Sequence, residues 1–245
     1  MHKGNGDQIM PWTITVIAGQ VRLDEPTSYT QKHAVEAIIV HQNFEGSTLT
    51  NDVALLKLKT QLDLSTNYVK AATLETVMPE PGTVCKVSGW GYLSEDAPIV
   101  SKDLMYVALP IIKPTRCREL LVNVTNLPLG MFCAGYEEGQ RDACQGDSGG
   151  GMICGDTLVG VVSGGEGCAR PTLPGLYSDV PYYLNWIKYN VKNYNVTDYG
   201  YIELASMSKG SPGNTSPNVY PTISFCSLSV TYTLLSFLSL KVSNW

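Results

Sequence analysis

The stretch 142–150, which reads DACQGDSGG, constrains the fold of this chain more than any other part of the sequence. Glycines flank Ser148 within it, so the backbone can turn sharply there, expose the hydroxyl group and direct two backbone N–H groups toward one oxygen atom. A nucleophilic serine with its oxyanion hole has this arrangement. An ordinary turn is the alternative, because serine between glycines is also common in turns.

The order of histidine, aspartate and serine along the chain excludes two folds for such a nucleophile. The chain has three histidines, His2, His33 and His41, and all of them precede Ser148. An α/β-hydrolase needs its histidine after the serine, and none follows. A subtilisin-like order needs an aspartate before the histidine, whereas the best-placed acid, Asp52, follows every histidine. Only the order histidine, aspartate, serine remains.

Five motifs resemble, in their order and spacing, those of the chymotrypsin-family serine proteases of the trypsin branch. In chain order they are NDVALL at 51–56, SGWG at 88–91, MFCAG at 131–135, the stretch 142–150 and PGLY at 174–177. The resemblance covers about residues 12–194. It implies an all-β fold of two six-stranded antiparallel Greek-key barrels, the first of them incomplete, with a C-terminal helix.

The hydrophobic pattern also predicts an all-β chain, because short β-rich runs alternate with glycine and proline. The expected strands are 13–23, 35–40, 53–58, 83–92, 104–112, 131–134, 152–163 and 175–180. Over 182–194 the apolar residues recur every three or four positions, which predicts a helix. The expected parts of the chain are a remnant of the N-terminal barrel (1–72), a connector between the barrels (73–81), the C-terminal barrel with its helix (82–194), a flexible linker (195–222) and an apolar tail (223–240).

The resemblance assigns catalytic roles to three residues. Ser148 would attack the scissile carbonyl group, and the N–H groups of Gly146 and Ser148 would bind the oxyanion that forms. Asp52 would orient a histidine and stabilise its cation. The implied reaction is cleavage of a polypeptide through an acyl-enzyme, so the expected partner is a polypeptide substrate or a protein inhibitor.

Four residues would form the substrate pocket on the same basis. Asp142 falls six residues before Ser148, where trypsin-like members place the carboxylate at the base of the pocket, and there it would select Lys or Arg. The others match positions in the pocket walls: Ser163, Gly165 and Gly175. Two positions depart from the family, since Gly164 stands where tryptophan is usual and Gly151 where proline is usual. These two departures leave the extended specificity open.

Seven cysteines indicate an oxidising compartment if most of them pair, whereas free buried thiols in a cytosolic protein are the alternative. Their spacing leaves the pairing open. The resemblance implies three disulfides and one cysteine left over: Cys85 with Cys154, Cys117 with Cys133, Cys144 with Cys168, and Cys226 alone. N-x-[ST] sequons at Asn123, Asn195 and Asn214 point the same way, so we expect a secreted or cell-surface protein.

Composition excludes other partners. The net charge of -5 leaves no basic stripe that could neutralise a nucleic-acid backbone. No histidine or acidic cluster has metal-ligand spacing, so we expect neither metal nor cofactor. The apolar tail 223–240 follows small residues and a polar spacer, as a lipid-anchor signal does, and we expect possible membrane attachment through it. A transmembrane helix and an artefactual tail are the alternatives.

The catalytic histidine is the missing part of the resemblance. The family places it in an Ala-Ala-His-Cys sequence ahead of the strand that matches 13–23, and this chain has no such run. The missing segment would also hold the amino terminus that, after activation, pairs with the acid matching Asp147. We therefore expect residues 1–245 to be inactive, with the active protein beginning upstream. A non-catalytic homologue that binds a partner is the second hypothesis, and a cytosolic binding protein of unrelated fold is the third.

Overall fold

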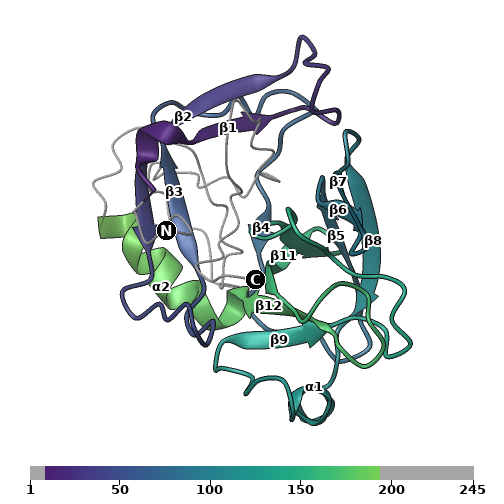
Figure 1. Ribbon diagram of the computed structural model, residues 1–245. Helices are drawn as coiled ribbons and strands as arrows, with labels where there is room; N and C mark the ends of the chain where they lie inside the picture. Colours follow the sequence, from purple (N-terminus) through teal and green to yellow (C-terminus); the bar gives the residue numbers. More distant parts are fainter. Residues whose placement is uncertain (1–8, 194–245) are drawn as a thin grey trace, which may run out of the picture.

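The structure is a computed structural model, and it describes residues 9–193. Two larger sheets, mostly antiparallel, lie side by side, and a C-terminal helix packs against both (Figure 1). This mostly β architecture confirms the predicted fold class. His2, Asn195, Asn214, Cys226, the linker 195–222 and the tail 223–240 lie outside the described residues.

The first sheet has three strands, which are ordered as in the chain. They are β1 (Thr15–Ala18), β2 (Gln31–Val40) and β3 (Ala54–Leu58), preceded by the 3-10 helix η1 (Pro11–Thr13). The strand expected over 13–23 is shorter because Gly19 turns the backbone at φ +71°, and a Cβ atom there would lie 2.5 Å from the Tyr29 carbonyl oxygen. Val16 and Val35 fill the buried face of this sheet.

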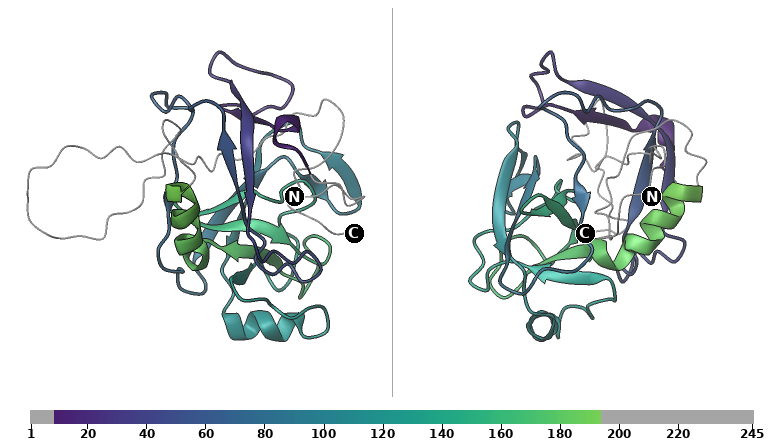
Figure 2. Two further views of the ribbon diagram at one scale, coloured as in Figure 1. Left: turned by 90° about the vertical axis from the view of Figure 1, so that its left-hand side faces the viewer. Right: turned by 180° about the vertical axis from the view of Figure 1, so that it is seen from behind.

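The second sheet curls like half of a barrel (Figure 2). Along its path lie β8 (Met105–Pro110), β5 (Val84–Gly89), β10 (Gly151–Cys154), β11 (Thr157–Gly164), β12 (Gly175–Asp179) and β9 (Met131–Ala134). A short strand from the expected connector, β4 (Thr73–Leu74), runs parallel to β11. Buried side chains continue along most of β11, as expected for a central strand.

Three local features differ from the sequence-based expectations. The expected strand 152–163 is two strands, because Gly155 adopts φ +60° in the turn between β10 and β11. The hairpin of β6 (Tyr92–Ser94) and β7 (Ala97–Val100) was not predicted. Nor was α1 (Pro114–Leu121), which is too short to show a helical period and begins with proline at its first position.

The terminal helix α2 (Val180–Asn193) joins the two sheets and confirms the predicted helix. Its buried face carries Tyr183, Leu184 and Ile187, which share one core with Leu55 of β3 and Leu158 of β11. Each such side chain contributes roughly 1.5–3 kcal/mol when fully buried. Within residues 9–193, no helix has the length and apolar character needed to cross a membrane.

Three disulfides cross-link the second sheet and the segments around it, with the pairing that the family resemblance implies. Cys85 and Cys154 join β5 to β10, Cys117 and Cys133 join α1 to β9, and Cys144 and Cys168 join two loops. Each contributes about 2–4 kcal/mol to stability by restricting the unfolded chain. The third disulfide differs from the others, because both of its cysteines lie in loops.

Candidate active site

Ser148 lies in the loop between β9 and β10, where backbone N–H groups alternate between bonded and free. The N–H groups of Asp147, Gly149 and Gly150 donate to the carbonyl oxygens of Cys144, Val162 and Asp147 at 3.0, 2.8 and 2.9 Å. Among residues 9–193, those of Gly146 and Ser148 donate to no acceptor. Two free donors thus lie on either side of the bonded N–H of Asp147.

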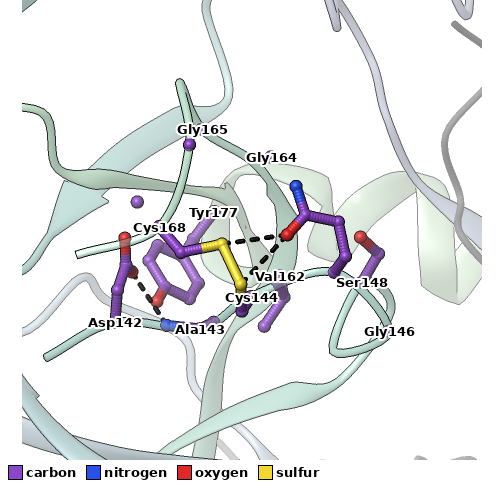
Figure 3. A pocket seen from close by; sticks show the side chains of 13 residues that line it. Asp142, Ala143, Cys144, Gly146, Ser148, Val162, Gly164, Gly165, Cys168 and Tyr177 are labelled. Carbon is purple, nitrogen blue, oxygen red and sulfur yellow. Dashed lines mark hydrogen bonds between the residues drawn. A yellow bond between two sulfur atoms is a disulfide. The ribbon is translucent and has the colours of Figure 1, made fainter. Parts of the chain in front are cut away.

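Position 146 requires glycine because of both its backbone conformation and its close neighbours. Its φ of +98° is one that side chains rarely adopt, and a Cβ atom there would lie 3.0 Å from the Gly91 Cα atom. The Ser148 hydroxyl has no hydrogen-bond partner within the described part of the chain. Figure 3 shows Ser148 and Gly146 on the same side of a cavity, with the Cys144–Cys168 disulfide beside it.

Asp147 supports this loop through its carboxylate. Its carboxylate accepts hydrogen bonds from the N–H groups of Gly91 and Cys144, both at 2.9 Å. Side chains at Gly89 or Gly91 would collide with the Asp147 carboxylate. Burial raises the pKa of Asp147. A second cavity of about 150 Å³ adjoins it, lined partly by apolar side chains such as Leu93 and Met105.

Ser148 and Asp142 line the same cavity, which we call the main cavity and which has a volume of about 70 Å³. Asp142 lies at the end opposite Ser148 (Figure 3). Its carboxylate accepts hydrogen bonds from the N–H groups of Ala143 and Ala169, at 2.8 and 3.1 Å. Burial raises the pKa of Asp142 to about 6, because two backbone bonds only partly offset the lost hydration. The cavity therefore contains an under-solvated carboxylate.

Two glycines and a tyrosine surround this carboxylate. A Cβ atom on Gly175 would lie 2.7 Å from Asp142 Oδ1 and 3.2 Å from the Tyr177 hydroxyl, so glycine leaves the space before the carboxylate open. Gly165 faces Gly175, since its Cβ atom would lie 3.7 Å from the Gly175 Cα atom. The Tyr177 hydroxyl is buried and has no hydrogen-bond partner among the described residues.

Asp52 precedes β3 and is 3% exposed, but it receives support from the second sheet. The Ser163 hydroxyl donates to Asp52 Oδ2 at 2.6 Å, and the Ser178 hydroxyl donates to the Asp52 carbonyl oxygen at 2.5 Å. Ser163 was expected to bind substrate, yet it is not among the residues that line the main cavity, whereas Gly165, Gly175 and Asp142 are. Its side chain holds the aspartate, and its role in substrate binding stays a prediction.

Both histidines of the described residues are engaged away from Ser148. His33 Nδ1 in β2 lies 2.7 Å from the hydroxyl oxygen of Thr60, which follows β3, and burial lowers the pKa of His33. The His41 ring packs against Trp186 of α2, with 5.1 Å between ring centroids, and accepts a hydrogen bond from the Asn43 N–H at 3.2 Å. Neither residue lines the main cavity.

The two departures from the family pattern have different surroundings. A Cβ atom at Gly164 would lie 3.2 Å from Leu49 Cδ1, so Leu49 covers one side of this wall residue. Leu49 itself has φ +58°, which is unusual for a leucine. A Cβ atom at Gly151 would meet only the end of the Leu158 side chain, at 2.7 Å. That flexible side chain can move aside.

The sequence analysis missed the roles of Tyr177 and Ser178. Both are at most 1% exposed in β12, in a strand whose neighbouring residues are also buried. A polar side chain within a fully buried strand needs a hydrogen-bonding partner. Polar residues in a strand that is otherwise apolar could therefore have indicated a contact at Tyr177 and Ser178. The donation from Ala169 to Asp142 left no comparable signal, because a backbone N–H has no residue-type preference.

Comparison with known proteins identifies a matching family and several relatives of this chain. The family model described as Trypsin matches residues 7–187. Trypsin eta of Drosophila melanogaster is 41% identical over 154 residues, which cover 62% of this chain and 58% of that protein. Trypsin-1 of Astacus astacus is 38% identical over 186 residues, or 74% and 76% of the two chains. Coagulation factor XII of Sus scrofa is 36% identical over 193 residues, which cover 73% of this chain and 31% of that protein.

Proposed function

Because this chain belongs to the trypsin family of serine proteases, we propose that its site is built to cleave polypeptides after Lys or Arg through an acyl-enzyme formed on Ser148, and that no histidine within residues 9–193 completes it. One observation carries the choice of Lys and Arg. The half-buried Asp142 carboxylate and Ser148 line one cavity, so a long cationic side chain that reached Asp142 would have its backbone near the serine. A cation offsets the desolvation of the carboxylate, which a neutral side chain cannot do.

Other contacts support the proposed chemistry. The free N–H groups of Gly146 and Ser148 are suited to an oxyanion on the carbon that the Ser148 hydroxyl attacks. Asp52 is oriented by Ser163, as an acid that positions a histidine must be. In the proposed mechanism, a histidine oriented by Asp52 would take the proton of the Ser148 hydroxyl and return it to the leaving amine. The second cavity beside Asp147 suits an apolar amino terminus whose ammonium group would offset the burial of that carboxylate.

A non-catalytic homologue that binds a polypeptide or an inhibitor is the second candidate. The observation in its favour is the placement of His33 and His41, which are both engaged elsewhere in residues 9–193. Such a protein would keep the main cavity and lose only the proton transfer. The two candidates therefore share the same binding specificity and differ in hydrolysis.

Binding of small ligands tests the specificity that both candidates share. The purified protein is expected to bind an aromatic amidine, which is a cation, about 100-fold more tightly than the neutral amide of the same shape, because a desolvated carboxylate left unpaired costs several kcal/mol. Isothermal titration at pH 8 measures both affinities. Equal affinities would contradict recognition of Lys and Arg and leave the family assignment untouched.

We place the protein outside the cell, because three disulfides suit an oxidising compartment.

Asn123 lies exposed in the loop after α1, and it begins the sequon Asn-Val-Thr. Protein secreted by eukaryotic cells is expected to carry a glycan on Asn123. Peptide mass spectrometry after enzymatic deglycosylation should show Asp at this position, and Asn123→Gln should abolish the signal. An unmodified Asn123 in secreted protein would contradict this. Membrane attachment through 223–240 remains part of the proposal.

A further inference from the structure

The β6–β7 hairpin connects the two loops that the Cys144–Cys168 disulfide also joins. At the base of the hairpin, the Tyr92 N–H donates to the Gln145 carbonyl oxygen at 2.8 Å. At its tip, Glu95 Oε2 accepts a hydrogen bond from the Cys168 N–H at 3.2 Å. Gln145 precedes Ser148 in its loop, and Cys168 lies in the loop before β12, so the hairpin spans one side of the main cavity.

Arg170 fixes the Glu95 carboxylate through a two-pronged ion pair. Its Nε atom donates to Glu95 Oε2 at 2.8 Å, and a terminal guanidinium nitrogen donates to Oε1. The pair lies against Gly167, where a Cβ atom would be 2.7 Å from Glu95 Oε2. Bidentate pairs impose direction as well as attraction. The carboxylate therefore holds two points of one loop at once, the Cys168 N–H and the Arg170 side chain.

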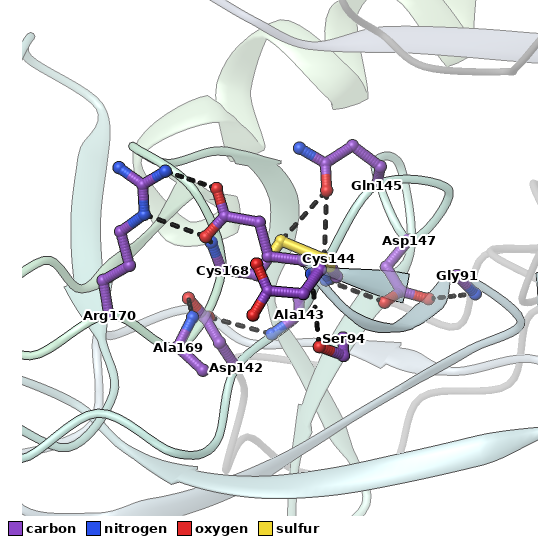
Figure 4. Close-up of a disulfide and its surroundings, with 12 residues drawn as sticks. Gly91, Ser94, Asp142, Ala143, Cys144, Gln145, Asp147, Cys168, Ala169 and Arg170 are labelled. Carbon is purple, nitrogen blue, oxygen red and sulfur yellow. Dashed lines mark hydrogen bonds and ion pairs between the residues drawn. A yellow bond between two sulfur atoms is a disulfide. The ribbon is translucent and has the colours of Figure 1, made fainter. Parts of the chain in front are cut away.

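The residue between those two points is Ala169, whose N–H donates to Asp142 Oδ2 at 3.1 Å (Figure 4). We propose that Glu95 is a positioning residue for the main cavity, which fixes 168–170 so that the Ala169 N–H holds the Asp142 carboxylate in place. This inference rests on the proposed recognition of cations by Asp142. It makes the hairpin tip, which does not line the cavity, a determinant of ligand affinity.

The exposure of the pair sets the size of the effect. The side chains of Glu95 and Arg170 are 29% and 46% exposed, so the ion pair alone contributes little to stability. Its effect is expected in the position of one loop. We expect Glu95→Gln to weaken binding of the aromatic amidine about 3- to 10-fold, since a charge-assisted bond to the loop is lost.

A second bidentate pair provides a matched control. Arg116 binds Glu137 with its Nε atom and a terminal nitrogen at 2.9 and 2.7 Å, and neither residue lines the main cavity. Glu137→Gln removes the same chemistry and is expected to change the affinity less than about 2-fold. Isothermal titration of the full chain with the amidine gives the affinities, thermal unfolding gives stability, and hydrogen exchange of the Ala169 amide reports the loop.

The outcomes separate this inference from the proposed function. Weaker binding and faster Ala169 exchange in Glu95→Gln, but not in Glu137→Gln, would support it. The inference would be overturned if the wild type bound the amidine and neither variant changed the affinity, or if both variants weakened it equally. Cation recognition by Asp142 would still stand in either case. If the wild type bound no amidine, cation recognition would fail, and unchanged Ala169 exchange in Glu95→Gln would overturn the positioning role as well. Arg170→Gln provides the same test if Glu95→Gln does not fold.

Discussion

In Asp142→Asn, binding of an aromatic amidine is expected to weaken by about 100-fold or more. The amidinium would enter the main cavity without a counter-charge, and removing one member of a buried charge pair costs about 2–5 kcal/mol. Asparagine keeps the shape of the side chain, so the fold is retained. Isothermal titration measures the loss. Asp156→Asn is the control, because this exposed aspartate lies in the turn between β10 and β11 and away from the main cavity.

The pH dependence of wild-type binding follows from the same carboxylate. The amidine binds ionised Asp142, whose pKa in the free protein is about 6. Affinity should therefore be full above pH 7 and fall about tenfold per unit below pH 6. The folded state also binds this proton more tightly than the unfolded chain, so the contribution of Asp142 to stability declines as the pH rises from about 4 to 6. An affinity that is flat between pH 5 and 8 would contradict this assignment.

Purified residues 1–245 are expected to hydrolyse an arginine ester no faster than Ser148→Ala does. A protease with all three triad members would be faster by about 10⁴-fold or more. We expect no faster hydrolysis because, within residues 9–193, no histidine is placed to accept the proton of the Ser148 hydroxyl. The two histidines that the structure describes contact Thr60 and Trp186. Amidine titration counts the folded cavities, so a missing rate cannot be attributed to unfolded protein.

His2 requires its own control, because it lies outside the described residues. His2→Ala is expected to leave the rate unchanged. Hydrolysis that is lost both in this variant and in Ser148→Ala would make His2 the base and show the expectation of inactivity to be wrong. Ester hydrolysis that survives Ser148→Ala would instead come from another group or a contaminant.

The sequence predicted those elements whose pattern is set locally. The expected strand 131–134 coincides with β9, and the terminal helix differs by two residues at its start. The hairpin β6–β7 was not predicted because its side chains are mostly exposed, so no buried face imposed an alternating pattern of apolar residues on its sequence. The turn at Gly155 did leave a signal that the expected strand 152–163 passed over, because Gly155-Asp156 between two β-rich runs is typical of a hairpin turn.

For the site, the sequence indicated residue types better than contacts. Ser148, Gly146 and Asp142 were expected together, and they line one cavity. The contact of Ser163 with Asp52 depends on how two sheets meet, which no local pattern encodes. The support of Asp142 by Ala169 depends on a backbone direction, which leaves no trace in residue type.

The distance along the chain between Asp52 and its supports has a consequence during synthesis. Its carboxylate receives the Ser163 hydroxyl from 111 residues downstream, and its carbonyl oxygen receives the Ser178 hydroxyl from 126 residues downstream. A nascent chain emerges from the ribosome at about 5–20 residues per second, so Asp52 waits several seconds for these partners. The two hydroxyl groups therefore reach Asp52 only when translation of the domain is nearly finished, so the contacts that join the two sheets at this acid form late in synthesis.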